Sequence, residues 1–204
     1  MGQLVAEAVR LYGSRFWPVI ALGIGPALVG VTFGAIPGRT QLAVAMTFGA
    51  MVMSASYALA TAVVTGIRPD PRTMSVAVTV GVIVAVPVPY LISLFLLPAI
   101  AWLAFFGLAV PVAIVERRGI LDSLGRGIRL ARADYIHAVG ALAALTIVGL
   151  LTTFALLFVL REQGDVTIAV AAFLSLLVTS PLLFLGGALL YVDQVARSAK
   201  PDAV

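Results

Sequence analysis

Glu116, His137 and Asp193 are side chains of types that transfer protons, and each lies at or near the end of an apolar segment. Hydrolysis of an ester or phosphodiester needs a general acid or base, and metal-assisted hydrolysis also needs clustered ligands. His137 is the only histidine, and the chain contains no cysteine, metal-binding histidine pair, phosphate-binding glycine loop or nucleophile elbow. We therefore expect a non-catalytic protein without a metal or cofactor. An enzyme that acts on lipids through these three residues is the alternative.

Composition indicates a membrane protein. The chain of 204 residues is 62% apolar and 11% charged, with a mean hydropathy of +1.13. Soluble domains carry about 25% charged residues, and a soluble core cannot absorb this much apolar surface without large exposed patches. The net charge of +4 raises the alternative of nucleic acid. Because no aromatic residues interleave with the basic ones to stack on bases, we expect no nucleic-acid partner.

The segments that must position these residues are long uncharged runs. Residues 16–38, 40–67, 73–115, 135–160 and 166–192 contain no Asp, Glu, Lys or Arg. A helix that crosses a bilayer needs about 20 apolar residues, so four of the runs fit one crossing each. The third run is long enough for two crossings. The sequence therefore predicts an all-α, polytopic membrane protein with six transmembrane helices.

Prolines indicate where the long run reverses. Pro removes a backbone donor and disfavours continued helix. We place the reversal near 95–98, beside Pro98, and expect Pro87 and Pro89 to kink the helix before it.

The arginines support this threading. With six crossings, one side of the membrane receives eleven of the thirteen basic residues and the other receives two. Such asymmetry follows the positive-inside rule and predicts that both termini are cytoplasmic. The first side carries Arg10, Arg15, Arg68, Arg72, Arg117, Arg118, Arg126, Arg129, Arg132, Arg197 and Lys200, and the second carries Arg39 and Arg161.

Charge is densest at residues 116–134, where helical spacing predicts an amphipathic helix. An apolar stripe and a charged face separate on this helix, as is typical of a segment that lies in the headgroup plane. The alternative is an ordinary solvated connector. The stripe is Ile120, Leu121, Leu124, Ile128, Ala131 and Tyr135, and the charged face is Arg118, Asp122, Arg126 and Arg129, with Asp122 and Arg126 at the spacing of an ion pair.

The N-terminal segment has the same pattern. Leu4, Ala8, Leu11 and Tyr12 share one face, with Arg10 and Arg15 off it, so we expect a second interfacial helix.

Shifting the numbering by 119 aligns the two amphipathic segments. Arg10-Leu11 then matches Arg129-Leu130, Phe16 matches Tyr135 and Gly30 matches Gly149. We interpret the chain as one membrane domain, 1–204, with a parallel internal repeat of 1–66 and 120–195 that flanks the helix pair 73–115. Chance similarity between apolar segments is the alternative.

These patterns suggest three groups of functional residues. Arginines of the two surface helices are expected to bind lipid headgroups, acids at span ends to form structural ion pairs, and glycines to let helices approach closely. The groups are Arg10, Arg15, Arg117, Arg118, Arg126, Arg129 and Arg132; Glu116 and Asp193 with Arg197; and Gly30, Gly34, Gly186 and Gly187. The expected partners are anionic membrane lipids, with a homo-oligomer or a partner membrane protein as further possibilities. A small transporter or channel for an uncharged or lipidic substrate is the alternative function, because proline-broken spans are common in transporters.

The stretch "PVAIVERRGILDSLGRGIRLARADYIHAVG" resembles a signature of the membrane domain attached to some bacterial glycerophosphodiester phosphodiesterases, and of stand-alone relatives without an assigned function. The matching positions are Pro111, Glu116, Gly119, Arg129-Leu130 and Tyr135, followed near the end of the chain by Tyr191, Asp193 and Arg197. The soluble phosphodiesterase domain is not in this sequence. The resemblance implies a six-span fold in the bacterial plasma (inner) membrane and no catalytic activity.

Overall fold

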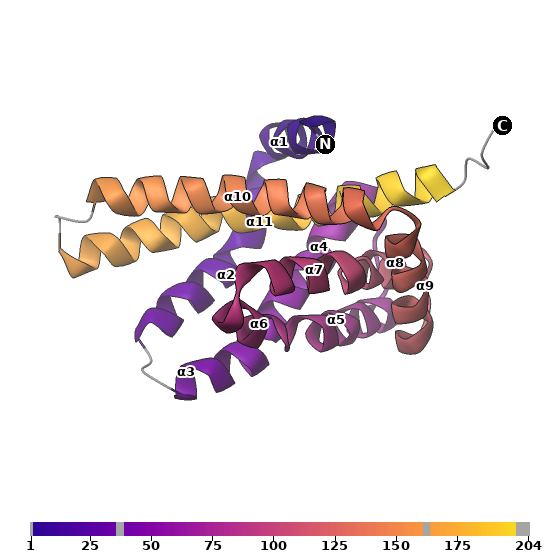
Figure 1. The fold of residues 1–204 in the computed structure, drawn as a ribbon, viewed down its shortest axis with the longest axis horizontal. Helices are drawn as coiled ribbons and strands as arrows, with labels where there is room; N and C mark the ends of the chain where they lie inside the picture. The colour runs from indigo at the N-terminus through magenta and orange to yellow at the C-terminus, as the bar shows by residue number, and fades with distance from the viewer. Residues whose placement is uncertain (1, 36–38, 161–163, 199–204) are drawn as a thin grey trace.

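The computed structural model describes residues 2–35, 39–160 and 164–198, and every regular element in these ranges is a helix. Figure 1 shows long helices side by side with short helices at their ends. Five segments are long and apolar enough to cross a bilayer: Thr40–Thr65, Pro71–Leu94, Leu96–Val115, Tyr135–Leu160 and Val166–Ser198. The chain is a multi-pass, all-α membrane protein, as its composition predicted.

A sixth candidate crossing is part of a bent pair. Helix α1 (Gly2–Ser14) ends just before Arg15, and α2 (Phe16–Ala35) leaves it at an angle of 106°. The Arg15 guanidinium donates to the Val63 carbonyl over 3.0 Å, which ties the bend to the end of α4. This bend is where the sequence predicted a surface helix leading into a span.

The second crossing consists of α3 (Arg39–Val44), the π-helix η1 (Ala45–Gly49) and α4 (Ala50–Thr65). It stops at Gly66, whose φ of 69° is the left-handed conformation that glycine adopts without steric cost. Helix α5 (Pro71–Ala85) then starts on Asp70, which accepts from the Thr73 amide, with Pro71 at the first helical position.

The reversal predicted near 95–98 occurs at Phe95. Its extended backbone, with φ −161° and ψ 153°, separates α6 (Val88–Leu94) from α7 (Leu96–Phe106). Pro98 lies in the first turn of α7, where its missing amide leaves no helical hydrogen bond unmade. The predicted kink is present as a break between α5 and α6 at Val86 and Pro87.

A single hydrogen bond joins the two arms of this hairpin. The Trp102 indole donates to the Val84 carbonyl over 2.9 Å. Val84 lies in the last turn of α5, where carbonyl groups lose their helical partners. The bond therefore satisfies an end-of-helix acceptor and fixes α7 beside the break.

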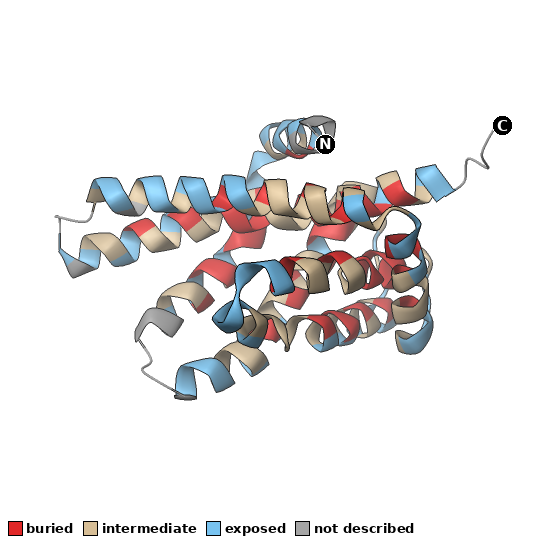
Figure 2. Cartoon of the chain, in the orientation of Figure 1, coloured by how far each residue is buried: buried red, intermediate tan, exposed pale blue. Residues whose placement is uncertain are grey.

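Helix α11 (Asp165–Ser198) is the central packing element. Its most extensive contacts are with α2 and α10 (Tyr135–Leu160), and it also packs against α4, α1, α9 and α8. Figure 2 shows buried residues concentrated where these helices meet, while much of α10 is exposed. An exposed apolar surface of this kind is covered by hydrocarbon when the helices lie in a bilayer.

Helix α8 (Ala109–Val115) leads through Arg117 into α9 (Ile120–Ala133), which runs across the ends of the long helices (Figure 1). The buried face of α9 is Ser123, Gly127, Leu130 and Ala131. Of the predicted apolar stripe, Ala131 belongs to this buried face, whereas Leu121 is 82% exposed. The helix turns toward its small residues since Gly127 lies directly against the backbone of Ala109, an approach that larger side chains prevent.

Candidate functional site

Five distant parts of the chain meet at one end of the bundle, where polar contacts join several of them. We call this region the charged end, and it comprises α1, α9, the loop before α5, the start of α10 and the end of α11. Its long-range contacts are Arg15 to the Val63 carbonyl, Glu116 with Tyr191, and Arg197 with Asp134. In the loop before α5, the hydrogen bond from Thr73 and, to a smaller extent, the charge of Arg117 lower the pKa of Asp70. Residues separated by up to 75 positions thus meet in one polar region.

Glu116 connects α8, α9 and α11. Its carboxylate accepts from Arg118 Nε at 2.5 Å, from Arg126 Nε at 3.3 Å and from the Tyr191 hydroxyl at 3.4 Å. Burial by itself raises the pKa of Glu116, but the hydrogen bonds from the two arginines outweigh it and hold the pKa below its usual value. Because Arg126 lies on α9 and Tyr191 on α11, this carboxylate holds the amphipathic helix against the bundle.

A second polar cluster joins the start of α10 to the end of α11. Arg197 donates through Nε to Asp193 at 2.8 Å and through Nη1 to Asp134 at 3.4 Å. Nε2 of His137 lies 3.2 Å from the Asp193 carboxylate. Asp134 also accepts from the His137 amide, which caps the first turn of α10. Asp193 therefore contacts its own helix and α10, and not an arginine of α9.

The fully buried Gln194 adds a third contact between these helices. Its Nε2 donates to the Asp134 carbonyl over 3.4 Å, while its Oε1 has no hydrogen-bond partner in the structure. An unpaired buried acceptor costs free energy. The hydrogen bonds that Gln194 Nε2 and Arg197 make to Asp134 offset this cost and hold the end of α11 in place.

The three residues with possible acid–base chemistry are divided between these clusters. His137 and Asp193 are in contact, whereas Glu116 is bound to the arginines of the α8–α9 segment. Within the described part of the chain, no group of three His, Cys, Asp or Glu side chains is placed to hold a metal ion. A carboxylate held by guanidinium groups is a weak base, so the arrangement favours structural ion pairs over proton transfer.

The expected headgroup arginines divide into two groups. Arg15, Arg118 and Arg126 are held by partners within the protein. The other four, Arg10, Arg117, Arg129 and Arg132, are exposed and form no ion pair with any residue that the structure describes. In this second group, Arg132 lies over the Phe105 ring at 5.6 Å, and Arg117 has a φ of 50°. The sequence pattern could not separate these groups, since both are spaced alike along the amphipathic segments.

Three of the four expected packing glycines lie at close helix contacts. A Cβ on Gly30 would meet Leu176, one on Gly186 would meet Leu145, and one on Gly187 would lie 2.9 Å from the Tyr57 hydroxyl. The surroundings of Gly34 lie outside the described side chains, as do Arg39, Arg161 and Lys200.

A further close contact between α2 and α11, at Gly23, was not predicted from the sequence. A Cβ on Gly23 would meet the Leu177 carbonyl, so α2 contacts α11 through Gly23 and Gly30. These two glycines are seven residues apart, a spacing that places them on one helix face and that could have identified the pair.

The two surface helices break away from their spans at matched positions. The breaks fall at Arg15 and Asp134, which are 119 residues apart, the shift that aligns the proposed repeats. The internal repeat stays a prediction.

No protein-family model, curated protein or solved structure matches this chain. The resemblance to the phosphodiesterase-associated membrane domain therefore rests on the short motifs alone. Function must be argued from the geometry.

Proposed function

We propose that this chain is a non-catalytic protein of the bacterial plasma membrane that binds anionic lipid headgroups at its charged end, with both termini in the cytoplasm. The observation that supports this proposal is the second group of arginines, Arg10, Arg117, Arg129 and Arg132. Their guanidinium groups lie on or beside the surface helices and form no ion pair with a carboxylate of the described chain, and only Arg117 acts at longer range on a carboxylate, that of Asp70. Anionic phosphates are the natural counter-ions at this depth.

The placement of acids supports the same reading. Glu116 is bound to Arg118 and Arg126, and Asp193 is bound to Arg197 and His137. The carboxylates therefore hold the surface helix and the long helices together, and Arg129 and Arg132 stay available to the membrane surface. The excess of basic residues at this end supports a cytoplasmic location, where anionic lipids gather.

The test compares lipid binding by matched variants. The triple variant Arg10→Gln, Arg129→Gln, Arg132→Gln removes three unpaired charges, each worth about 1 kcal/mol near an anionic surface, so affinity should fall about 100-fold. The assay is titration of detergent-purified protein with fluorescent phosphatidylglycerol, and with phosphatidylcholine as the zwitterionic comparison. Arg39→Gln, at the opposite end of the chain's first hairpin, is the control and should bind like the wild type.

The result that overturns the proposal is an unchanged preference for phosphatidylglycerol in the triple variant. The same assay separates lipid binding from docking of a partner protein on these arginines. A protein-docking surface has no reason to prefer one lipid class, so the wild type would then bind both lipids alike.

A second candidate is transport of an uncharged or lipidic substrate. The break at Val86 and Pro87 and the π-helix η1 both interrupt regular helix inside spans, and transporters use such interruptions at their binding sites. Flux of a fluorescent lipid between the leaflets of proteoliposomes tests it, and a flux equal to that of empty vesicles rules against it.

A further inference from the structure

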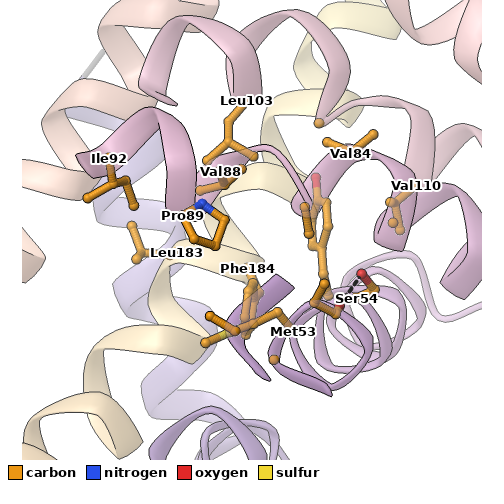
Figure 3. A pocket seen from close by; sticks show the side chains of 17 residues that line it. Met53, Ser54, Val84, Val88, Pro89, Ile92, Leu103, Val110, Leu183 and Phe184 are labelled. Carbon is orange, nitrogen blue, oxygen red and sulfur yellow. Dashed lines mark hydrogen bonds between the residues drawn. The ribbon is translucent and has the colours of Figure 1, made fainter. Parts of the chain in front are cut away.

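A cavity of the bundle lies away from the arginines, between η1, α4, α5, α6, α7, α8 and α11. Its volume is about 400 Å³, and Figure 3 shows the side chains that surround it. The labelled walls are almost entirely apolar, and include Met53, Val84, Leu103, Val110 and Phe184. Ser54 and Tyr57 carry the hydroxyl groups of the wall, and the Ser54 hydroxyl already donates to the Ala50 carbonyl at 2.6 Å. The cavity therefore offers little to a polar ligand or to water.

The cavity is closed toward the charged end and open at α6. On the closed side, Ser54 lies against Gly81, and a buried apolar cluster that includes Ala77 and Ile114 fills the space beyond. On the open side, Pro89 is half-buried and Ile92 is 52% exposed, three residues before the reversal at Phe95. The entrance therefore faces the bilayer in the half of the membrane away from the arginines.

The helices at the entrance are the two irregular ones. The π-helix η1 contacts α6, and α6 follows the break at Val86 and Pro87. Because Pro87 and Pro89 lack amide donors, the helical hydrogen bonds are interrupted between α5 and α6 within the span Pro71–Leu94, beside η1. A π-helix in a span is uncommon and occurs frequently at functional sites.

We propose that this cavity binds the hydrocarbon chain of a membrane lipid, which enters from the bilayer between η1 and α6. An apolar cavity of about 150 Å³ already stays dry and accepts benzene, and this one is more than twice that size. Hydrocarbon chains are the apolar groups that surround the entrance, since every helix that lines the cavity belongs to a candidate membrane span.

A second cavity of about 190 Å³ lies between α4, α7, α10 and α11, and shares part of the wall of the first. The shared residues include Tyr57, Leu103 and Phe184. A long chain has room to continue there when Leu103 changes rotamer. The site does not depend on the proposed headgroup arginines, because it uses different residues at the other end of the spans.

The test is photo-crosslinking with a phosphatidylcholine that carries a diazirine in the middle of one acyl chain, in nanodiscs of unlabelled phosphatidylcholine. Mass spectrometry compares adducts on Met53, in the cavity wall, with adducts on Leu151, which is 64% exposed on α10. The wild type should give similar yields at both residues. In Ala85→Phe, which places a ring in the cavity, the Met53 yield should fall at least fivefold relative to Leu151.

Two further variants make the result decisive. Ile92→Trp narrows the entrance from an exposed position that tolerates a large side chain, and it should lower the Met53 yield even where the filled variant fails to fold. Ile83→Phe, at a position of α5 that is 46% exposed, is the control and should leave the ratio unchanged. Adducts on Leu151 without adducts on Met53 in the wild type would overturn the proposal, as would equal ratios in wild type and Ile92→Trp. The triple arginine variant should keep the wild-type ratio, so the two proposals fail separately.

Discussion

Glu116→Gln should loosen the amphipathic helix α9 from the bundle. The amide keeps the shape of the side chain but removes the charge that faces Arg118 and Arg126. Exposed ion pairs contribute about 0.2–1 kcal/mol, and breaking a fully buried pair costs about 3–5 kcal/mol. The Glu116 and Arg126 side chains are 19% and 32% exposed, so their pair lies nearer the exposed limit. We expect a loss of about 1–2 kcal/mol.

Two measurements follow this loss. The melting temperature in detergent should fall by about 2–8 °C, at about 2–4 °C per kcal/mol for a chain of this length. Hydrogen exchange of α9 amides should accelerate by about 5–30-fold if the helix detaches by local opening.

Matched variants of the two arginines locate the effect. Arg126→Gln should resemble Glu116→Gln, whereas Arg118→Gln should change little because that side chain is 44% exposed. In a double-mutant cycle, Glu116→Gln and Arg126→Gln should couple by at least about 0.5 kcal/mol. Additive effects of the two substitutions, or unchanged α9 exchange in Glu116→Gln, would refute the assignment of Glu116 as the residue that holds α9.

Two other predictions concern the same helix. Gly127→Val should destabilise the protein by about 1–3 kcal/mol and speed hydrogen exchange of α9, because its Cβ would lie 2.8 Å from the backbone nitrogen of Ala109, which cannot move aside. Gly125→Val is the control: the nearest atom there is a flexible guanidinium 3.7 Å away, so no steric clash should destabilise the protein or detach α9. Acid should lower the melting temperature of the wild type more than that of Glu116→Gln. The pKa of Glu116 in the folded protein is below its ordinary value of 4.5. The ionised carboxylate therefore stabilises the fold above pH 4.5, and this stabilisation is lost as the pH falls through the lower pKa. Parallel melting curves of the two proteins between pH 7 and pH 3.5 would contradict this.

The spans and their reversal could be predicted because their causes are local. Uncharged runs of sufficient length demand a bilayer, and proline interrupts a helix wherever it occurs. The reversal at Phe95 and the break at Pro87 both follow from these rules. The same reasoning identified the surface helix α9, since its charges and apolar residues separate at helical spacing.

The orientation of α9 could not be predicted in this way. Periodicity shows which face of a helix is apolar, but not which face packs against the protein. In α9 the face that contains the small side chains Ser123 and Gly127 is buried, and Leu121 is exposed. Close approach to α8 decided the rotation, and that contact depends on two helices rather than one.

The polar contacts required distances that a sequence does not contain. An arginine spaced four residues after Asp122 predicted a pair within α9, yet Arg126 reaches back to Glu116. Glu116 also meets Tyr191, 75 residues further along. The apolar cavity had no sequence signal except its irregular borders, because a void is a property of the space between helices.

Helix α11 contacts α1, α2, α4, α8, α9 and α10, and all of them precede it in the chain. A ribosome therefore delivers the earlier spans to the translocon before the helix that binds them together has been made. Until then, surfaces such as the Gly23–Gly30 face of α2 are not covered by α11, and we expect insertases or proteases of the membrane to have access to them. Assembly of this bundle is thus coupled to the synthesis of α11, and a nonsense mutation within α11 should be as damaging as one in α2.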